Sequence, residues 1–143
     1  MKTVKDVLKA KNRQASSVGP NITVFEAVWL MADEKIGSLL VMEGDKILGI
    51  ITERDYARKV IIEGKSSREM AVKDIMTTKI VVVKPENTME ECMALMTEKR
   101  IRHLPVVEND KVVGIISIGD AVKAVIDDLH LNINTFLSYI TGG

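Results

Sequence analysis

The sequence predicts a mixed α/β fold built from two tandem copies of one β-α-β-β-α unit. The main observation is an internal repeat: residues 20–55 align without a gap on residues 85–120, and 15 of the 36 pairs are identical. In each copy a helix signal is followed by two apolar runs that are joined by a short polar turn. Two copies of one unit predict pseudo-twofold symmetry, with the sheets of the two copies meeting at a central cleft.

The first helix of each copy begins at a capping box. In Thr23-Val-Phe-Glu26 and in Thr88-Met-Glu-Glu91, a threonine stands three residues before a glutamate. In this pattern the hydroxyl accepts a hydrogen bond from a backbone N–H, and the carboxylate reaches back to the capping residue. Apolar residues follow at helical spacing in both copies, which predicts amphipathic helices with one buried face.

Strands are expected to follow these helices in pairs. The paired runs are Ser38–Met42 with Lys46–Ile51, and His103–Val107 with Lys111–Ile116. A second helix is expected from Thr52 in the first copy and from Ser117 in the second. Short strands are also expected at residues 15–18 and 80–84, ahead of the first helix of each copy.

We interpret the whole chain, residues 1–143, as one module. The first repeat is placed at residues 4–64 and the second at residues 72–130. Val4–Leu8 is similar to Val72–Met76 at an offset of 68, so each repeat is expected to begin with a short leading helix. The polar residues 63–69 link the halves, and the tail at residues 131–143 is expected to add a short helix capped by Asn134 or Thr135.

Composition excludes several classes of function. The 20 Lys and Arg residues balance the 20 Asp and Glu residues, which argues against bulk binding to nucleic acid or to an acidic membrane. No apolar run approaches the roughly 20 residues that span a bilayer, and the N-terminus has no hydrophobic signal core. The lone Cys92 cannot form an internal disulfide, which indicates a reducing compartment, and we expect a cytoplasmic protein. His103 and His130 are too few to suggest a metal site.

Both copies end with the same motif, which is the strongest candidate for a ligand-binding site. Gly49-Ile-Ile-Thr52-Glu-Arg-Asp55 aligns with Gly114-Ile-Ile-Ser117-Ile-Gly-Asp120. One interpretation is structural, because a hydroxyl and an aspartate at this spacing cap a helix. The other is functional: a hydroxyl at a helix start can hold a phosphate, and an aspartate one turn later can bind the hydroxyls of a ribose. The glycine would let a ligand approach the backbone closely. The two interpretations are compatible.

Together these features resemble a pair of CBS domains, also called a Bateman module, of the stand-alone bacterial kind. The run Ile101-Arg-His-Leu-Pro-Val-Val107 and the segment Thr52-Glu-Arg-Asp-Tyr-Ala-Arg-Lys59 add to this resemblance, which covers residues 4–130. It implies a regulatory module, not an enzyme, that binds adenosine ligands in its central cleft and passes their state to an effector protein. The implied ligands are AMP, ADP, ATP, NAD or S-adenosylmethionine.

The resemblance also assigns roles to residues of the motif. It implies that Asp55 and Asp120 bind ribose and that Thr52 and Ser117 lie on the phosphate side. It further implies that a basic pair at the start of the middle strand reaches phosphate, and Arg102 and His103 match that pair.

The two sites are not expected to be equivalent, because the copies differ around the motif. Arg102 and His103 align with glycine and serine in the first copy. Arg54 and Arg58 lie one helical turn apart, so both could contact a phosphate tail, although they could equally form a solvated helical face. A ligand-free structural or docking module, in which the motifs are only helix caps, remains the alternative function. An enzyme acting on adenosine compounds is disfavoured, because no activated nucleophile or acid–base pair accompanies the motif.

Apolar residues on outer helical faces predict a homodimer. Phe25 and Trp29 lie one turn apart in the first copy, where the second copy has Glu90 and Ala94. Aromatic residues of this kind favour subunit interfaces, although cover by the chain's own termini is the competing explanation. The tail offers a further apolar surface at Phe136, Leu137 and Ile140.

Overall fold

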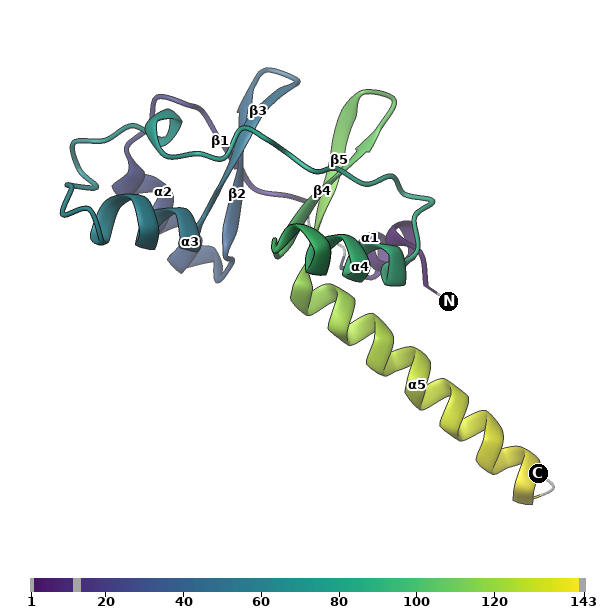
Figure 1. Cartoon of the computed structure of the whole chain (residues 1–143). Helices are drawn as coiled ribbons and strands as arrows, with labels where there is room; N and C mark the ends of the chain where they lie inside the picture. Colours follow the sequence, from purple (N-terminus) through teal and green to yellow (C-terminus); the bar gives the residue numbers. More distant parts are fainter. Residues whose placement is uncertain (1, 12–13, 142–143) are drawn as a thin grey trace. The chain divides into compact units, whose positions relative to one another are not determined.

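The computed structural model describes residues 2–11 and 14–141 and divides them into two compact units. One unit gathers residues 2–11, 82–108 and 114–141, and the other gathers residues 14–81 and 109–113. Both contain helices packed on a small sheet, so the predicted mixed α/β class is confirmed (Figure 1).

The elements follow the predicted order, except that the strand expected at residues 80–84 is reduced to an isolated bridge at Val83. The helical segments are α1 (Val4–Lys11), α2 (Val24–Glu34), α3 (Glu53–Tyr56), the π-helical turn η1 (Ala57–Ile61), the 3-10 turn η2 (Val72–Asp74), α4 (Met89–Lys99) and α5 (Ile118–Thr141). The strands are β1 (Ser17–Val18), β2 (Ser38–Glu43), β3 (Lys46–Thr52), β4 (His103–Glu108) and β5 (Lys111–Ser117).

In the unit that contains residues 14–81, the sheet has the order β1-β2-β3. The short strand β1 is parallel to β2, and β2 is antiparallel to β3. At the start of α2, Thr23 Oγ1 accepts a hydrogen bond from the Glu26 N–H at 3.1 Å, so the threonine half of the predicted capping box is confirmed, but among the described residues the glutamate completes the box in α4 and not in α2. The buried face of α2 and the inner residues of β2 and β3 form one aliphatic core, which includes Val24, Met31 and Ile51.

The other unit repeats this arrangement around β4 and residues 114–117 of β5. Val83 forms a parallel bridge with Val106, in the position that β1 takes in the first repeat. The capping box of α4 is complete, because Thr88 and Glu91 exchange both of their hydrogen bonds. Cys92 is fully buried on the inner face of α4, and this burial raises the pKa of its thiol to about 11. It therefore acts as a small core side chain and not as a nucleophile.

The leading segment of each repeat packs with the other repeat. The Val4 N–H donates to the Asn87 carbonyl at 2.8 Å, and the Val72 N–H donates to the Ile22 carbonyl at 2.9 Å. These two contacts are equivalent, because Ile22 and Asn87 are related by the 65-residue repeat. The sequence alone predicts that each leading helix packs with the repeat that follows it, and this prediction is wrong. A linear repeat cannot reveal this exchange, because both copies offer the same acceptors.

The motif glycines face these leading segments. A Cβ on Gly49 would stand 2.7 Å from the Thr77 carbonyl oxygen and 2.9 Å from Met76 Sδ. A Cβ on Gly114 would stand 2.6 Å from Leu8 Cδ2. The interpretation that these glycines make room for a ligand is therefore corrected: the space that a side chain would take is filled by the chain's own leading segments.

The C-terminal helix also differs from expectation. The sequence predicts a separate short helix in the tail, whereas α5 runs unbroken from Ile118 to Thr141. Asn134 and Thr135 lie inside it and do not cap it, because no glycine or proline interrupts residues 120–141. Ala121 and Ala124 are buried, while every residue from 129 to 141 is exposed. Among the described helices, none is both long enough and apolar enough to cross a membrane.

Candidate functional site

The predicted turn at Thr52 is a complete helix cap. Thr52 ends β3, and its Oγ1 accepts a hydrogen bond from the Asp55 N–H at 3.1 Å. In return, the Thr52 N–H donates to Asp55 Oδ2 at 3.0 Å. The Glu53 N–H donates to the Gly37 carbonyl at 3.1 Å, which fixes the start of α3 beside β2. The structural interpretation of this motif is therefore confirmed for the first repeat.

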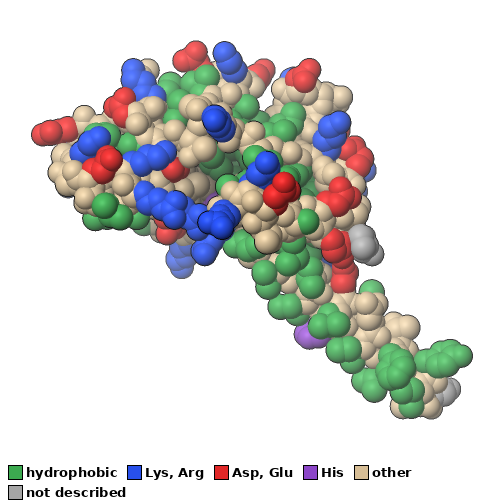
Figure 2. All heavy atoms as spheres, viewed as in Figure 1, with side chains coloured by type: hydrophobic (Ala, Val, Ile, Leu, Met, Phe, Trp, Pro, Cys, Tyr) green, Lys and Arg blue, Asp and Glu red, His purple; other side chains and the backbone are tan. Residues whose placement is uncertain are grey.

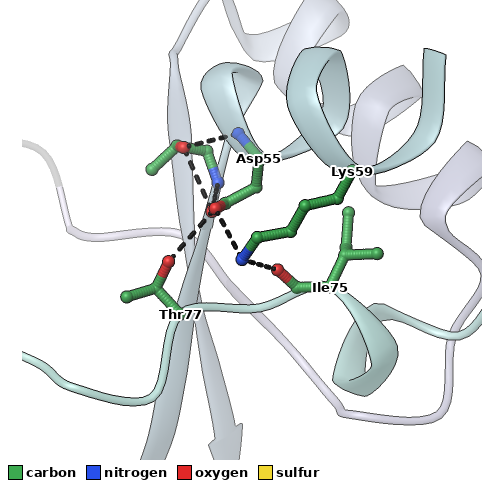
Figure 3. A network of polar contacts seen from close by, with 5 residues as sticks. Asp55, Lys59, Ile75 and Thr77 are labelled. Carbon is green, nitrogen blue, oxygen red and sulfur yellow. Dashed lines mark hydrogen bonds and ion pairs between the residues drawn. The ribbon is translucent and has the colours of Figure 1, made fainter. Parts of the chain in front are cut away.

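The Asp55 carboxylate also connects α3 to the segment that follows η2 (Figure 3). Thr77 Oγ1 donates to Asp55 Oδ1 at 3.1 Å, and Lys59 Nζ lies 3.2 Å from the same oxygen. Lys59 Nζ also donates to the Ile75 carbonyl at 2.8 Å. Both carboxylate oxygens are thus in contact with protein donors, and only 10% of the Asp55 side chain is exposed.

The second repeat builds a similar turn with a different lysine. Ser117 Oγ accepts from the Asp120 N–H at 3.1 Å, and the Ser117 N–H donates to Asp120 Oδ2 at 2.9 Å. Lys11 Nζ, at the end of α1, lies 2.9 Å from Asp120 Oδ2 and donates to the Ile115 carbonyl at 3.0 Å. Among residues 2–11 and 14–141, the contacts of the Asp120 carboxylate all fall on Oδ2.

These contacts hold Asp120 in its charged form. Burial alone would raise the pKa of Asp120, but the hydrogen bonds from Lys11 and Ser117, together with the charge of Lys11, outweigh it. The pKa of Asp120 is therefore lowered from its ordinary value of 3.8. A negative charge stands at the first turn of α5 at neutral pH, next to the positive end of the helix dipole.

The lowered pKa of Asp120 predicts a pH-dependent contribution to stability. Its ionised form stabilises the fold fully above the unfolded-state pKa, and this stabilisation is lost as the pH falls through the lower folded-state pKa. Asp120→Asn is therefore expected to reduce the free energy of unfolding by about 1–2 kcal/mol at pH 7, and by less at pH 3. Urea unfolding at both pH values measures the difference. An equal loss at pH 3 and pH 7 would contradict the prediction, and Asp33→Asn on the exposed face of α2 is the control.

The structure groups the predicted basic residues with the two turns. Arg54 and Arg58 are exposed on α3 and η1, within two turns of Asp55. Arg102 is exposed, and its carbonyl accepts from the Ile118 N–H at 2.8 Å, which brings the start of β4 next to the start of α5. His103 is half-buried at the first position of β4. Contact of these four side chains with a ligand stays a prediction.

Sequence reasoning missed three side chains of these networks. Lys59 could have been found, because it lies four residues after Asp55 on the same helical segment. Thr77 and Lys11 carry no such signal, because they lie 22 and 109 residues from their aspartates in sequence. No cluster of three or more His, Cys, Asp or Glu side chains suited to a metal ion occurs in the described part of the chain.

Comparison with known proteins identifies the family. The CBS domain family model matches twice, at residues 4–62 and 72–127. The chain is 40% identical over 150 residues to the CBS domain-containing protein CBSX3, mitochondrial, of Arabidopsis thaliana, covering 99% of this chain and 73% of the relative. A solved protein with CBS domains from Burkholderia ambifaria is 52% identical with a TM-score of 0.85, covering 89% of this chain and 96% of that one.

A third similar protein is itself described as a hexamer. The hexameric CBS-CP12 protein from bloom-forming cyanobacteria is 32% identical with a TM-score of 0.75, covering 85% of this chain and 70% of that one. The two family-model matches coincide with the internal repeat, and the solved relatives share its fold. The chain belongs to the CBS-domain family and carries two CBS domains in tandem.

Proposed function

We propose that this protein binds an adenine nucleotide and transmits the bound state to an effector protein. CBS-domain proteins are typically regulatory modules, and they generally bind adenine-containing ligands. The observation that carries the proposal is the doubled turn, in which a hydroxyl, a helix start and a carboxylate occupy the same few residues in both repeats. The module is proposed to act by binding and not by catalysis.

The turn at Ser117 is proposed as the stronger of two binding sites. Asp120 Oδ1 would accept hydrogen bonds from ribose hydroxyls, while Oδ2 keeps its contacts with Lys11 and Ser117. The Ser117 hydroxyl and the first N–H groups of α5 would face phosphate, because a helix N-terminus attracts anions. Arg102 or His103, at the start of β4, would add positive charge on the phosphate side.

The turn at Thr52 is proposed as a weaker site with the same roles. Asp55 would bind ribose, Thr52 would lie near phosphate, and Arg54 and Arg58 would contact the phosphate tail. A ribose hydroxyl can reach the Asp55 carboxylate only by replacing one of its protein donors, such as Thr77. That replacement reduces the net gain from binding.

Asparagine substitution at Asp120 tests the proposal directly. Asp120→Asn keeps the size of the side chain but removes its charge, and losing charge-assisted hydrogen bonds to ribose should weaken nucleotide binding roughly tenfold or more. Calorimetric titration with AMP, ADP, ATP, NAD and S-adenosylmethionine measures the dissociation constants. Asp127→Asn, two turns further along α5 in a surface ion pair with Lys2, is the matched control and should bind like the wild type.

The ligand itself can be identified without choosing candidates in advance. Mass spectrometry of small molecules released from the purified, denatured protein would show which nucleotide co-purifies. Saturating ligand should also raise the melting temperature, because it binds only the folded state. If none of the five compounds binds or shifts the melting temperature, the nucleotide proposal is wrong.

That negative result would favour the alternative function, a structural or docking module. The contacts of Asp55 support this alternative, because its carboxylate is saturated by donors from the protein itself. In that case the motifs act only as helix caps, and the surface that matters is a partner interface.

The proposal also includes a homodimer in the cytoplasm. Trp29 is 59% exposed and Phe25 is 37% exposed, with the Arg68 guanidinium 4.0 Å from the centre of the Phe25 ring. Either these aromatic residues or the exposed tail residues Phe136, Leu137 and Ile140 would form the subunit interface. The cytoplasmic location is proposed from the single cysteine, which suits a reducing compartment.

A further inference from the structure

Most of the exposed large hydrophobic side chains in the described chain lie on α5. Figure 2 shows hydrophobic side chains along this helix, continuing into the half that extends beyond α1 and α4. Six of these exposed side chains lie on one face of the helix, at alternating spacings of four and three residues: Val122, Ile126, Leu129, Ile133, Phe136 and Ile140. We call these six residues the α5 seam.

The α5 seam has the spacing of a coiled coil. Its members are separated by four, three, four, three and four residues, which is the 3.5-residue period of a heptad repeat. The first core position of the heptad then holds Ile126, Ile133 and Ile140, and the second holds Val122, Leu129 and Phe136. Isoleucine at all three first positions, with Leu129 at the central second position, fits the pattern that favours a parallel two-stranded coiled coil.

A different face of α5 packs against the core of the unit to which this helix belongs. Ala121 and Ala124 are buried at 0% and 2%, and Asp127 turns to Lys2 with an Oδ2–Nζ distance of 3.1 Å. At 100° per residue these three positions point away from the α5 seam. The seam therefore remains accessible along its whole length while the helix stays attached to its unit.

The exposed half of α5 needs a covering partner. Residues 129–141 hold Asn132, Asn134 and Thr135, which are weak helix formers. A solvated helical segment of this length is only marginally stable in water. Burying the α5 seam against another surface would supply the missing stability, because removing apolar side chains from water is favourable.

The lack of acidic, Lys and Arg residues in this segment favours a second copy of the chain as the partner. Residues 129–141 contain no Asp, Glu, Lys or Arg. A helix that lies on an anionic membrane has basic residues on its polar face, and one that binds nucleic acid neutralises phosphates. Two copies of an uncharged helix can instead pair about a twofold axis without repulsion, placing each isoleucine against its counterpart.

We propose that α5 pairs with α5 of a second copy of this chain as a parallel two-stranded coiled coil along the α5 seam. The proposal specifies the homodimer of the proposed function, and it does not depend on nucleotide binding.

A pair of lysine substitutions tests whether the α5 seam, and not another face of the helix, forms the dimer interface. Ile133→Lys places a charge in the centre of the α5 seam, whereas Leu131→Lys places the same charge outside it, at a position that is 64% exposed. Sedimentation equilibrium should give a dimer for the wild type and for Leu131→Lys. Ile133→Lys should raise the dimer dissociation constant at least a hundredfold. A monomeric wild type, or equal effects of the two substitutions, would overturn the proposal, as would a monomer that co-sediments with phosphatidylcholine vesicles.

Disulfide trapping tests the parallel orientation. Ile140→Cys lies on the α5 seam near its end, so two parallel helices bring the introduced thiols together and oxidation should link the copies. Thr135→Cys lies outside the seam and should remain unlinked, and the buried Cys92 does not compete. A dimer that depends on Ile133 but does not cross-link through Ile140→Cys would overturn the parallel arrangement.

Nucleotide titration of Ile133→Lys distinguishes failure of the coiled-coil proposal from failure of the nucleotide-binding proposal. Retained nucleotide binding by the monomer would leave the nucleotide site intact whatever the outcome for the coiled coil. Conversely, a dimeric wild type that binds no nucleotide, together with a cross-linked Ile140→Cys variant, would support the coiled coil and contradict the proposal of nucleotide binding.

Discussion

Replacing Asp55 with alanine is expected to lower the free energy of unfolding by about 2–4 kcal/mol. The substitution removes the acceptor for the Thr52 N–H and the Thr77 hydroxyl and leaves Lys59 without its ion pair. The Thr52 and Thr77 groups are partly buried, so the loss of an acceptor costs more than it would on the surface. Because the Lys59 side chain is 43% exposed, its ion pair adds only a small part of the total.

Urea unfolding followed by far-ultraviolet circular dichroism measures this loss. Asp55→Asn should be less damaging, because its carbonyl oxygen can still accept one of the hydrogen bonds. Glu53→Ala, next to Asp55 but exposed, controls for a changed side chain in the same helical turn. A stability for Asp55→Ala within 0.5 kcal/mol of the control, about the size of an ordinary surface effect, would show that the network of Figure 3 does not hold the unit together.

Gly49→Ala is expected to reduce the free energy of unfolding by about 1–3 kcal/mol, as overpacking of a close contact does. The new Cβ would lie 2.7 Å from a backbone oxygen, that of Thr77, which can move only if the segment after η2 moves. Gly114→Ala should cost less, because its Cβ meets the end of the Leu8 side chain, which can rotate.

Gly19→Ala is the matched control for both glycines. No atom lies within 4 Å of the Cβ that it would add, so its free energy of unfolding should stay close to that of the wild type. Thermal and urea unfolding of the three variants give the order. If Gly49→Ala proves as stable as Gly19→Ala, the leading segment does not pack on β3 as described.

Local signals account for the part of the fold that the sequence predicted well. The capping threonines act within three residues of their partners, and the hairpins join strands that are neighbours in the chain. In the second hairpin, Asn109 and Asp110 both adopt positive φ values, as a two-residue turn between antiparallel strands favours. Such features depend on few residues, so a pattern of six or seven positions contains the necessary information.

The features that the sequence did not predict depend on contacts between residues far apart in the chain, which no short pattern encodes. The ion pair of Lys11 with Asp120 joins residues 109 positions apart, and it forms because α1 packs with the second repeat. The length of α5 was underestimated because Asn134 and Thr135 suit a helix start as well as an exposed helix interior. The role of the motif glycines was misjudged because the segments that fill their space are remote in sequence.

The exchange of leading segments has a consequence for synthesis of the chain. When the first repeat has left the ribosome, α1 still lacks its partners, because Pro85 and Asn87 have not yet emerged. The hairpin of β2 and β3 likewise waits for residues 72–77 to cover Gly49. Neither sequence repeat can therefore complete its own core during translation, and a fragment cut between residues 62 and 72 would leave both parts with an unmatched surface. The two halves are expected to fold cooperatively, after the second repeat has emerged.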